Sequence, residues 1–260
     1  MTAEGIAHLG TRSIAVAGCG GVGGAHALTM ARMGVGRFHL SDPGLFDEPD
    51  INRQWGATVK TLGKKKVNVY RQMLLEINPD LQIETFPEGV TPRRHEKFLE
   101  GVHLLIDCLD VNVPIELREE LHEEARKRSI FIMTAPILGF GCLVVCSSPE
   151  GMPMGTFTRL LHQTKSETHF PDFMKKIFMA NHLDLIEENL KSGKLPSLAV
   201  APVIATALLA TESIAYFLDG IIPGSRKPVV LPKVIFFDLF RMSYFILDAR
   251  IVLKSTKEGS

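Results

Sequence analysis

Residues 13–42 of the chain read SIAVAGCGGVGGAHALTMARMGVGRFHLSD. The apolar run Ser13–Ala17 ends at a cluster of glycines, and residues 25–33 then have the composition of a helix. A second apolar run, Arg37–Ser41, comes next and leads directly into Asp42. A strand, a glycine turn, a helix and a second strand make one βαβ unit, in which the strands are parallel. This stretch therefore predicts the first unit of an α/β sheet.

The rest of the chain continues the alternation of strands and helices. Short apolar runs predict strands, and longer amphipathic runs predict helices. The expected strands are 81–86, 102–107, 130–133, 142–146, 229–238 and 244–253, and the expected helices are 64–77, 92–100, 113–128 and 197–218. We expect a doubly wound, Rossmann-like, mainly parallel α/β sheet with helices on both faces, which the C-terminal strands extend.

Length and composition favour a single soluble domain over residues 1–260. Hydrophobic residues make up 45% of the chain, and 29 basic side chains balance 29 acidic ones. Such a balance gives no argument for nucleic acid or for an anionic membrane. Residues 150–195 lack strand-like alternation and are expected to form a crossover or lid segment. The apolar stretch 197–218 is long enough to span a bilayer, but its polar residues, including Glu212, favour a core helix and no membrane.

The cysteines and the N-terminus bear on the compartment and on zinc. The chain has four cysteines and no CxxC pair, which argues against a structural zinc site. The first residues, MTAEGIAHLG, lack the basic and apolar segments of a secretory signal. We therefore expect a reducing, cytoplasmic location and no zinc.

Residues 18–23, GCGGVG, fit the pattern G-x-G-x-x-G between a strand and a helix. Glycines allow the tight turn and let backbone N–H groups approach a phosphate at a helix N-terminus. Asp42 ends the second strand, where a carboxylate can accept hydrogen bonds from ribose hydroxyls. The pattern suits NAD as well as ATP, and a glycine turn without a ligand is the plain alternative. The expected phosphate-binding glycines are Gly18, Gly20, Gly21 and Gly23.

Charged residues in the loops that follow the strands separate ATP from NAD. Arg53 and Gln54 lie in the loop after the second strand, Lys66 opens the next expected helix, and Asp110 follows a buried strand. Open α/β sheets bind ligands at this edge. A protein that handles ATP needs positive groups for the phosphates and a carboxylate for magnesium. An NAD-dependent oxidoreductase, the alternative, has no obvious use for this set.

In these motifs the chain resembles the ThiF/MoeB/HesA family, bacterial relatives of the ubiquitin-activating E1 adenylation domain. The resemblance is carried by AGCGGVGGAHALTMARMGVGRFHLSDPGLFDEPDINRQ at 17–54 and by LGKKKVNVYRQMLLEINPDLQIE at 62–84. It continues in LLIDCLD at 104–110 and, more weakly, in PSLAVAPVIATALLATESIAYFLDG at 196–220. The N-R-Q and G-x-x-K-V pieces are far more specific than the glycine pattern alone.

The resemblance implies ATP-dependent adenylation of a carboxylate with Mg²⁺. Asp42 would hold the ATP ribose, and Gln54 would belong to the same nucleotide site. Arg53 and Lys66 would bind the triphosphate and the charge that develops at the α-phosphate, and Asp110 would hold Mg²⁺. In this family the carboxylate is usually the C-terminal glycine of a ubiquitin-like protein.

The resemblance also implies a homodimer and a set of candidate acceptors. The acceptor would be a ubiquitin-like or small carrier protein or a peptide. A modified tRNA base, as in the family's tRNA threonylcarbamoyladenosine dehydratases, is an alternative that the neutral charge does not support.

The chain departs from the family pattern in four places. Gly44 stands where the family has a second acid, and Asp50 stands where it has a phosphate-side asparagine. The asparagine that follows the magnesium aspartate is replaced by Val111, with Asn112 one place late. The family's N-terminal R-Y-x-R-Q helix is not expected here, and Arg12 is a poor substitute for its arginine. A degenerate, non-catalytic family member is therefore an alternative.

Sulfur and metal chemistry receive weaker support. Cys142 and Cys146 lie four residues apart on one expected strand and are predicted to pack in the core. No cysteine follows Cys146, so we expect no thioester cysteine, with Cys19 and Cys108 as weak exceptions. The crossover contains His162, His169 and His182. A metal site there would need acidic co-ligands, for which Asp172 and Asp184 are the candidates. We expect these histidines to lie on the surface instead.

Overall fold

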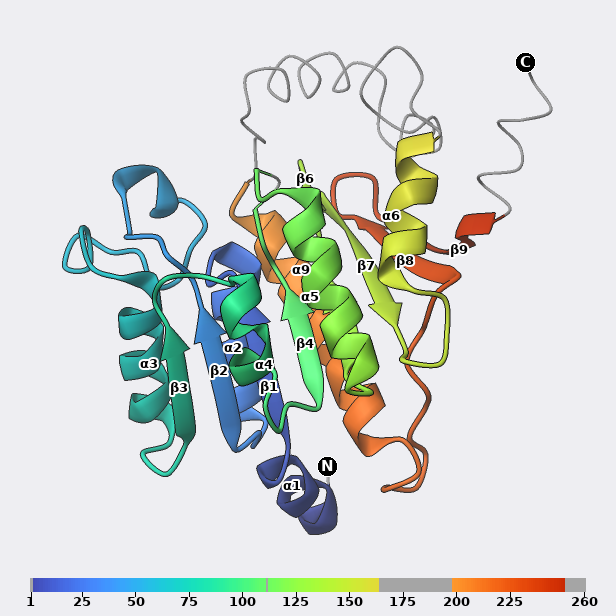
Figure 1. Cartoon of the computed structure of the whole chain (residues 1–260), viewed down its shortest axis with the longest axis horizontal. Coiled ribbons are helices and arrows are strands. Elements are labelled where there is room, and N and C mark those ends of the chain that lie inside the picture. Colours follow the sequence, from blue (N-terminus) through green and yellow to red (C-terminus); the bar gives the residue numbers. More distant parts are fainter. Residues whose placement is uncertain (1, 111, 164–197, 251–260) are drawn as a thin grey trace.

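The sequence around the glycine cluster forms the centre of a parallel sheet (Figure 1). The computed structural model of the chain describes residues 2–110, 112–163 and 198–250. The parallel part of the sheet has the order β3-β2-β1-β4-β5. Its strands are β1 (Ser13–Ala17), β2 (Arg37–Ser41), β3 (Gln82–Phe86), β4 (Leu104–Asp107) and β5 (Phe131–Thr134). The predicted doubly wound, mainly parallel sheet is confirmed.

Antiparallel strands continue the sheet beyond β5. They are β7 (Gly141–Ser147), β8 (Lys233–Asp238) and β9 (Ser243–Asp248), and the short β6 (Ile137–Leu138) pairs with β7. The C-terminal strands thus extend the sheet as expected. The prediction that the first of them begins at residue 229 is wrong. Pro228 and Pro232 lack the N–H group that a strand ladder needs, so β8 begins after them.

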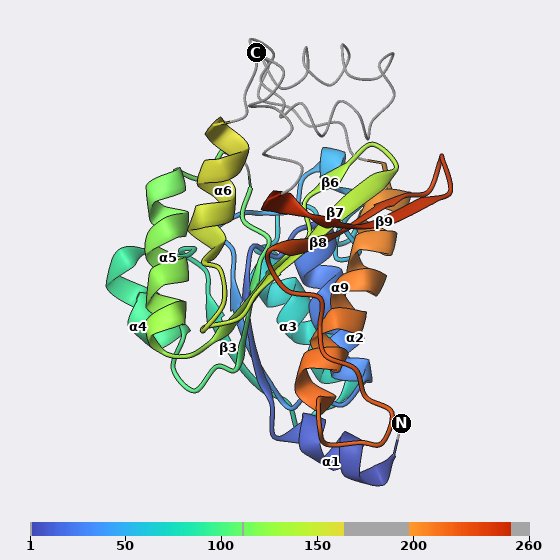
Figure 2. The same ribbon diagram turned by 90° about the vertical axis from the view of Figure 1, so that its right-hand side faces the viewer.

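Helices cover both faces of the sheet (Figure 2). One face carries α2 (Gly21–Arg32), α3 (Lys66–Ile77) and α9 (Val200–Leu218). The other carries α4 (His95–Phe98), α5 (Ile115–Lys127) and α6 (Met154–Gln163). The helix expected over 92–100 is instead a 3-10 turn, Pro92–Arg94, followed by the single turn of α4. Of the expected crossover 150–195, α6 is described, and residues 164–197 lie outside the described residues.

Side chains of β1 alternate between two apolar clusters. Ile14 and Val16 face α2, α3 and α9, whereas Ala15 and Ala17 face α4, α5 and α6. All these side chains are fully buried. A strand covered on both faces gains from an apolar residue at every position, which explains its unbroken apolar run.

Helix α2 begins at Gly21, four residues before the expected start at 25. Its first turn contains glycines that close packing requires rather than residues chosen for helix propensity. A Cβ atom at Gly23 would lie 2.0 Å from the Gly18 carbonyl oxygen, and one at Gly24 would lie 2.0 Å from the Tyr70 ring. Because glycines are poor helix formers, the sequence pattern did not predict this first turn of the helix.

An N-terminal helix, α1 (Ala3–Gly10), was not expected from the sequence. Thr2 caps it by accepting a hydrogen bond of 3.1 Å from the Gly5 N–H group, and Glu4 lies in its first turn. These two residues are the local signal for a helix start. The helix lies against α9 near the amino end of β1.

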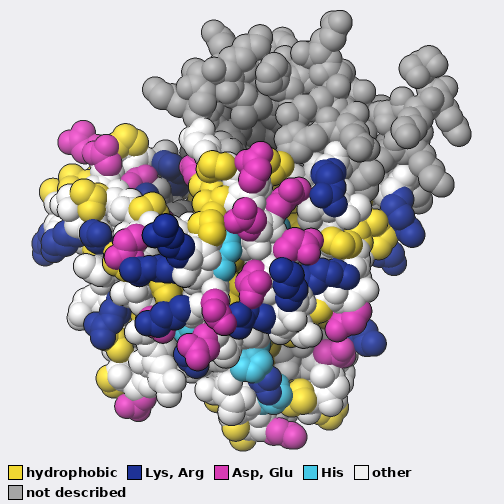
Figure 3. All heavy atoms as spheres, in the orientation of Figure 1, with side chains coloured by type: hydrophobic (Ala, Val, Ile, Leu, Met, Phe, Trp, Pro, Cys, Tyr) yellow, Lys and Arg dark blue, Asp and Glu magenta, His cyan; other side chains and the backbone are white. Residues whose placement is uncertain are grey.

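Helix α9 is long and apolar enough to cross a membrane by length and composition. However, 56% of the most apolar 18-residue stretch of this helix is buried inside the protein. It packs on α2 and on β7 as the predicted core helix. On the molecular face drawn in Figure 3, basic and acidic side chains are interspersed, which agrees with the balanced composition.

A neutral histidine lies in the contact between α2 and α9. His26 is fully buried, and its Nε2 atom shares a hydrogen bond of 3.0 Å with the Ser213 hydroxyl. Burial lowers the pKa of His26 to about 3, because the interior disfavours the charged form.

This histidine is expected to make the fold sensitive to acid. At a pH below the ordinary histidine pKa of about 6.5, His26 binds a proton in the unfolded chain but stays neutral in the folded protein. The free energy of unfolding therefore falls by about 1.4 kcal/mol for each unit by which the pH is lowered. His26→Gln keeps a nitrogen for Ser213 but cannot titrate, so the variant should lose this share of the pH dependence. Denaturant titrations of both proteins at about pH 7 and about pH 5 measure it. Equal pH dependence of the two proteins would contradict the assignment.

Candidate nucleotide-binding site

The carboxyl ends of β1, β2 and β4 meet at one edge of the sheet. Ala17 pairs with Ser41 on one side and with Asp107 on the other. The Gly18 N–H group donates to the Ser41 carbonyl over 2.7 Å, and the Cys108 N–H group donates to the Ala17 carbonyl over 2.8 Å. The loops that carry the predicted site residues therefore all start from this hydrogen-bonded edge.

The glycine loop turns so tightly that its first position needs a glycine. Gly18 has a φ of +93°, and a Cβ atom there would lie 2.2 Å from the Cys108 carbonyl oxygen. Gly20 is the N-cap of α2, and no side chain caps this helix end. The N–H groups of the first turn therefore point outward without a side-chain acceptor, which is the arrangement that binds phosphates. Gly20 and Gly21 are only partly buried, so the loop is accessible from this edge.

Asp42 joins the glycine loop to the loop that follows β2. Its carboxylate accepts a hydrogen bond of 2.7 Å from the Cys19 N–H group and another of 2.7 Å from the Gly44 N–H group. Each oxygen keeps a lone pair, so the carboxylate can still accept hydrogen bonds from ribose hydroxyls. A side chain at Gly44 would place its Cβ 2.9 Å from Asp42. At the position where the family has a second acid, Gly44 thus provides a backbone N–H group to Asp42.

Lys66 is the first residue of α3, and a backbone contact brings it to the site. Its N–H group donates to the Gly44 carbonyl over 3.1 Å, and Leu45 forms a β-bridge with Lys65. The side chain is 14% exposed, and its ammonium lies 5.6 Å from the centre of the Phe46 ring. Lys66 is therefore held close to the loop that follows β2.

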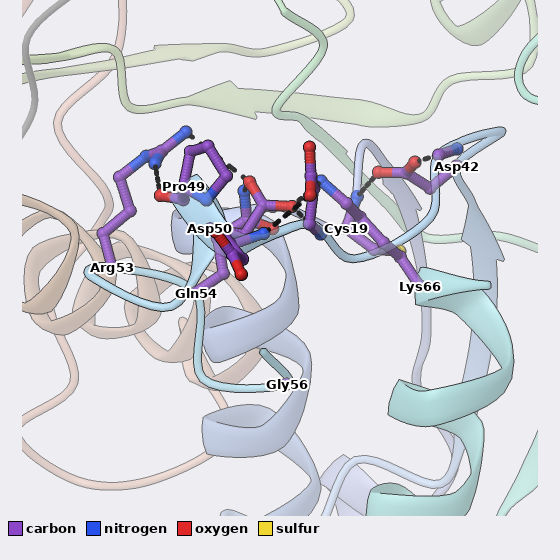
Figure 4. Close-up of polar contacts among 12 residues, drawn as sticks. Cys19, Asp42, Pro49, Asp50, Arg53, Gln54, Gly56 and Lys66 are labelled. Atoms are coloured by element: carbon purple, nitrogen blue, oxygen red, sulfur yellow. Dashed lines mark hydrogen bonds and ion pairs between the residues drawn. The ribbon is translucent and has the colours of Figure 1, made fainter. Parts of the chain in front are cut away.

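Asp50 is the acid that departs from the family pattern, and it lies between the two predicted cations (Figure 4). Its carboxylate is 3.2 Å from the Lys66 ammonium and 3.8 Å from the Arg53 guanidinium. It also accepts hydrogen bonds from the Asp47 N–H group and from the Gln54 amide. Two cations and two hydrogen-bond donors therefore surround this carboxylate.

Arg53 and Gln54 extend the same cluster. The Arg53 guanidinium donates to the Pro49 carbonyl over 2.8 Å and to the Asn52 side chain over 3.0 Å. Gln54 is 6% exposed and faces Gly20, with its Oε1 atom buried and without a hydrogen-bond partner. The structure thus brings the predicted glycines, Asp42, Arg53, Gln54 and Lys66 to one edge of the sheet.

Asp110 is exposed in the loop after β4. Its carboxylate accepts hydrogen bonds from the Asn112 backbone over 3.0 Å and from the Asn112 amide over 2.9 Å. The asparagine that comes one place late in the sequence therefore still touches this acid. Val111 lies outside the described residues.

A buried polar network beneath Asp110 was missed by the sequence analysis. Arg118 on α5 donates to the carbonyls of Leu109 and Asp110 over 2.7 and 3.0 Å. Its guanidinium also lies 3.2 Å from Asp107, which shares a hydrogen bond of 2.8 Å with His122. In the sequence, the only signal was the spacing of Arg118 and His122, which places them one helical turn apart on one face of the helix.

The charge of Asp107 is stabilised despite its burial. Burial raises the pKa of this carboxyl, but the hydrogen bond from His122, the nearby Arg118 and the Leu109 N–H group outweigh it. The net effect is a lowered pKa, so Asp107 stays ionised at neutral pH and anchors Arg118.

The four thiols lie in surroundings that keep them protonated. Cys142 and Cys146 are buried in the core as predicted. Burial raises the pKa of Cys142 to about 12 and raises that of Cys146 well above its ordinary value. Burial also raises the pKa of Cys19, with a further rise from Asp42, and it raises that of Cys108. A thiolate nucleophile is therefore disfavoured at each described cysteine.

Two weaker expectations concern arginine and metal. Arg12 precedes β1 at the amino end of the strand, opposite the glycine loop, so it does not reach this site. His169 and His182 lie outside the described residues, as do Asp172, Asp184 and the side chain of His162. Within the described residues, no group of three or more metal-ligating side chains is gathered.

Sequence comparison finds adenylating and dehydratase relatives. The chain is 33% identical over 133 residues to the tRNA threonylcarbamoyladenosine dehydratase of Bacillus subtilis (strain 168), which covers 51% of each protein. It is 26% identical over 136 residues to the sulfur carrier protein ThiS adenylyltransferase of Escherichia coli (strain K12), which covers 52% of this chain and 53% of that relative. The matches therefore span about half the length of these relatives.

Two solved structures illustrate the likeness of the fold. PaaA superimposes with a TM-score of 0.69 at 20% identity, covering 94% of this chain and 66% of PaaA. E. coli MccB with ATP superimposes with a TM-score of 0.66 at 16% identity, with the same coverage. These likenesses show the fold.

The family model of the ThiF family matches residues 1–258, nearly the whole sequence. The glycine loop, the strand order and the loop residues described above all fall within this match. The chain belongs to the ThiF family.

Proposed function

We propose that this protein is an ATP-dependent adenylating enzyme that activates a carboxylate. The observation that carries the proposal is the meeting of an uncapped helix N-terminus, a ribose-type acid and two cations at one edge of the sheet. ThiS adenylyltransferase among the sequence relatives, and MccB solved with ATP and with MccA among the structures, support it.

Each group in the site suits one part of Mg-ATP. The first turn of α2 offers N–H groups to the phosphates, and the Asp42 carboxylate has free lone pairs for the ribose. Lys66 and Arg53 supply positive charge, as a triphosphate requires. Asp110 is an exposed carboxylate that would bind Mg²⁺ together with phosphate oxygens and water.

The proposed reaction needs positioning and charge more than proton transfer. An oxygen of the ionised carboxylate forms a bond to the α-phosphorus, and the bond from that phosphorus to the pyrophosphate oxygen breaks. The products are an acyl-adenylate and pyrophosphate. Lys66 and Arg53 would stabilise the negative charge that accumulates on the phosphates, and the rigid strand ends would hold the reactants in line.

An external nucleophile would then take the activated acyl group. The described thiols are buried with raised pKa values, so a thioester on this chain is disfavoured. We propose that the carboxylate that is activated belongs to a ubiquitin-like or small carrier protein, or to a peptide, and that the enzyme is a cytoplasmic homodimer. A tRNA-linked carboxylate is the second candidate, which the Bacillus subtilis dehydratase favours.

Nucleotide choice gives the first test of this function. Mg-ATP should raise the melting temperature of the protein more than NAD or NADP at equal concentration, because a ligand stabilises the fold in proportion to its affinity. At a concentration of about 100 Kd, the gain is about 2.7 kcal/mol, which corresponds to a shift of several degrees. A larger rise in melting temperature with NAD than with Mg-ATP would contradict the adenylation proposal.

The roles of Asp110 and Lys66 predict different metal dependence. Asp110→Asn should weaken ATP binding chiefly in the presence of Mg²⁺, because it removes a magnesium ligand. Lys66→Ala should weaken binding with or without Mg²⁺, because the ammonium contacts phosphate directly. Each loss should be about tenfold or more, the size expected for a charge-assisted contact. Calorimetric titrations with Mg²⁺ and with a chelator measure it, and a uniform loss in Asp110→Asn would assign that residue a structural role.

The identity of the carboxylate can be tested by isotope exchange. Labelled pyrophosphate should enter ATP only when the true acceptor is present, because the first half-reaction is reversible. Small proteins ending in Gly-Gly, short peptides and tRNA carrying threonylcarbamoyladenosine form three separate arms. Acceptors lacking the carboxylate, as amides, are the matched controls. Exchange in the tRNA arm alone would move the protein to the second candidate function.

A further inference from the structure

One anion lies where the proposed function calls for positive charge. Asp50 is 9% exposed and contacts Lys66 at 3.2 Å and Arg53 at 3.8 Å, the two cations proposed to bind the triphosphate. Figure 4 shows the Lys66 side chain reaching from α3 toward this carboxylate. The acid therefore neutralises part of the positive charge of the site before any nucleotide arrives.

The local structure holds this carboxylate in place. Asp50 ends the 3-10 turn Glu48–Asp50 and closes a capping box, in which the Asp47 N–H group donates to it over 3.2 Å. The buried Gln54 amide donates to its other oxygen. With donors on both oxygens, the side chain cannot swing away from the cations without breaking these two hydrogen bonds and both ion pairs. A bound nucleotide must therefore share Lys66 and Arg53 with Asp50.

Sharing the cations affects the two forms of ATP unequally. Together Asp50, Lys66 and Arg53 carry one net positive charge, because two cations face one anion. Metal-free ATP carries more negative charge than its magnesium complex, so a fixed carboxylate beside the phosphates repels it more strongly. The carboxylate therefore reduces the attraction of the site for metal-free ATP more than its attraction for the magnesium complex.

We propose that Asp50 is a specificity residue that shifts the preference of the site away from metal-free ATP and toward magnesium-bound ATP. The inference rests on the proposed function, since it assumes that Lys66 and Arg53 bind the phosphates. It differs from a positioning role, in which Asp50 would only hold Lys66 and its removal would weaken both forms of ATP. The quantity that separates these two roles is the ratio of the two dissociation constants.

Asp50→Asn is the direct test, because asparagine keeps an oxygen acceptor for the cap and the same shape while removing the charge. We expect the variant to bind metal-free ATP about fivefold more tightly than the wild type, with a change of about twofold or less for Mg-ATP. The preference for the magnesium complex should fall accordingly. Calorimetry with excess Mg²⁺ and with a chelator gives both constants for the full chain.

Glu48→Gln is the matched control. Glu48 is exposed on the same 3-10 turn, so this variant removes one negative charge nearby without touching the two cations. Its two constants should change in parallel and by less than twofold. Asp50→Ser, which keeps one oxygen acceptor, serves as a second neutral variant if the asparagine form folds poorly. The melting temperature without nucleotide reports whether each variant retains the fold.

Each result supports or overturns the inference. A fall in magnesium preference in Asp50→Asn, absent in Glu48→Gln, supports it. Weaker binding of both forms in Asp50→Asn, or an unchanged preference, overturns it while leaving the proposed function in place. A wild-type protein that binds neither form of ATP overturns the proposed function and the inference together.

Discussion

The close approach of two backbones at the end of the central strands governs this site. The glycine loop packs on the chain that leaves β4, with so little room that a Cβ at Gly18 would lie 2.2 Å from the Cys108 carbonyl oxygen. Hydrogen bonds from Gly18 to β2 and from Cys108 to β1 lock three strand ends into one register. Because these ends are fixed, the first turn of α2, Asp42 and the loop of Asp110 occupy set positions relative to one another.

The charges of the site are organised in two separate groups around that edge. On one side, the loop after β2 and the start of α3 gather Asp50, Lys66 and Arg53 into a compact cluster. On the other side, Arg118 donates hydrogen bonds to two carbonyls of the Asp110 loop and forms an ion pair with the buried Asp107. Removing one member of a buried charge cluster leaves its partner uncompensated, so each group functions as a unit.

The residues that depart from the family pattern make contacts within these groups. Gly44 donates its N–H group to Asp42, and Asn112 reaches Asp110 from one position later. Asp50 is not simply a lost asparagine, because donors surround it on both oxygens. At each of these three positions the altered residue therefore makes defined contacts with the rest of the site.

The sequence by itself determined the parallel sheet, the glycine loop and the core position of Cys142 and Cys146, and it predicted the candidate site residues that the structure brings to one edge of the sheet. Strands buried on both faces and glycines between a strand and a helix leave direct local patterns, so β1 and β2 have the predicted bounds. The start of α2, the Asp107–Arg118–His122 network and the ion pairs of Asp50 were decided only by tertiary structure. These features depend on contacts between segments far apart in the chain, such as Gly24 with Tyr70 and Asp50 with Lys66, and no local periodicity encodes a distance between such atoms.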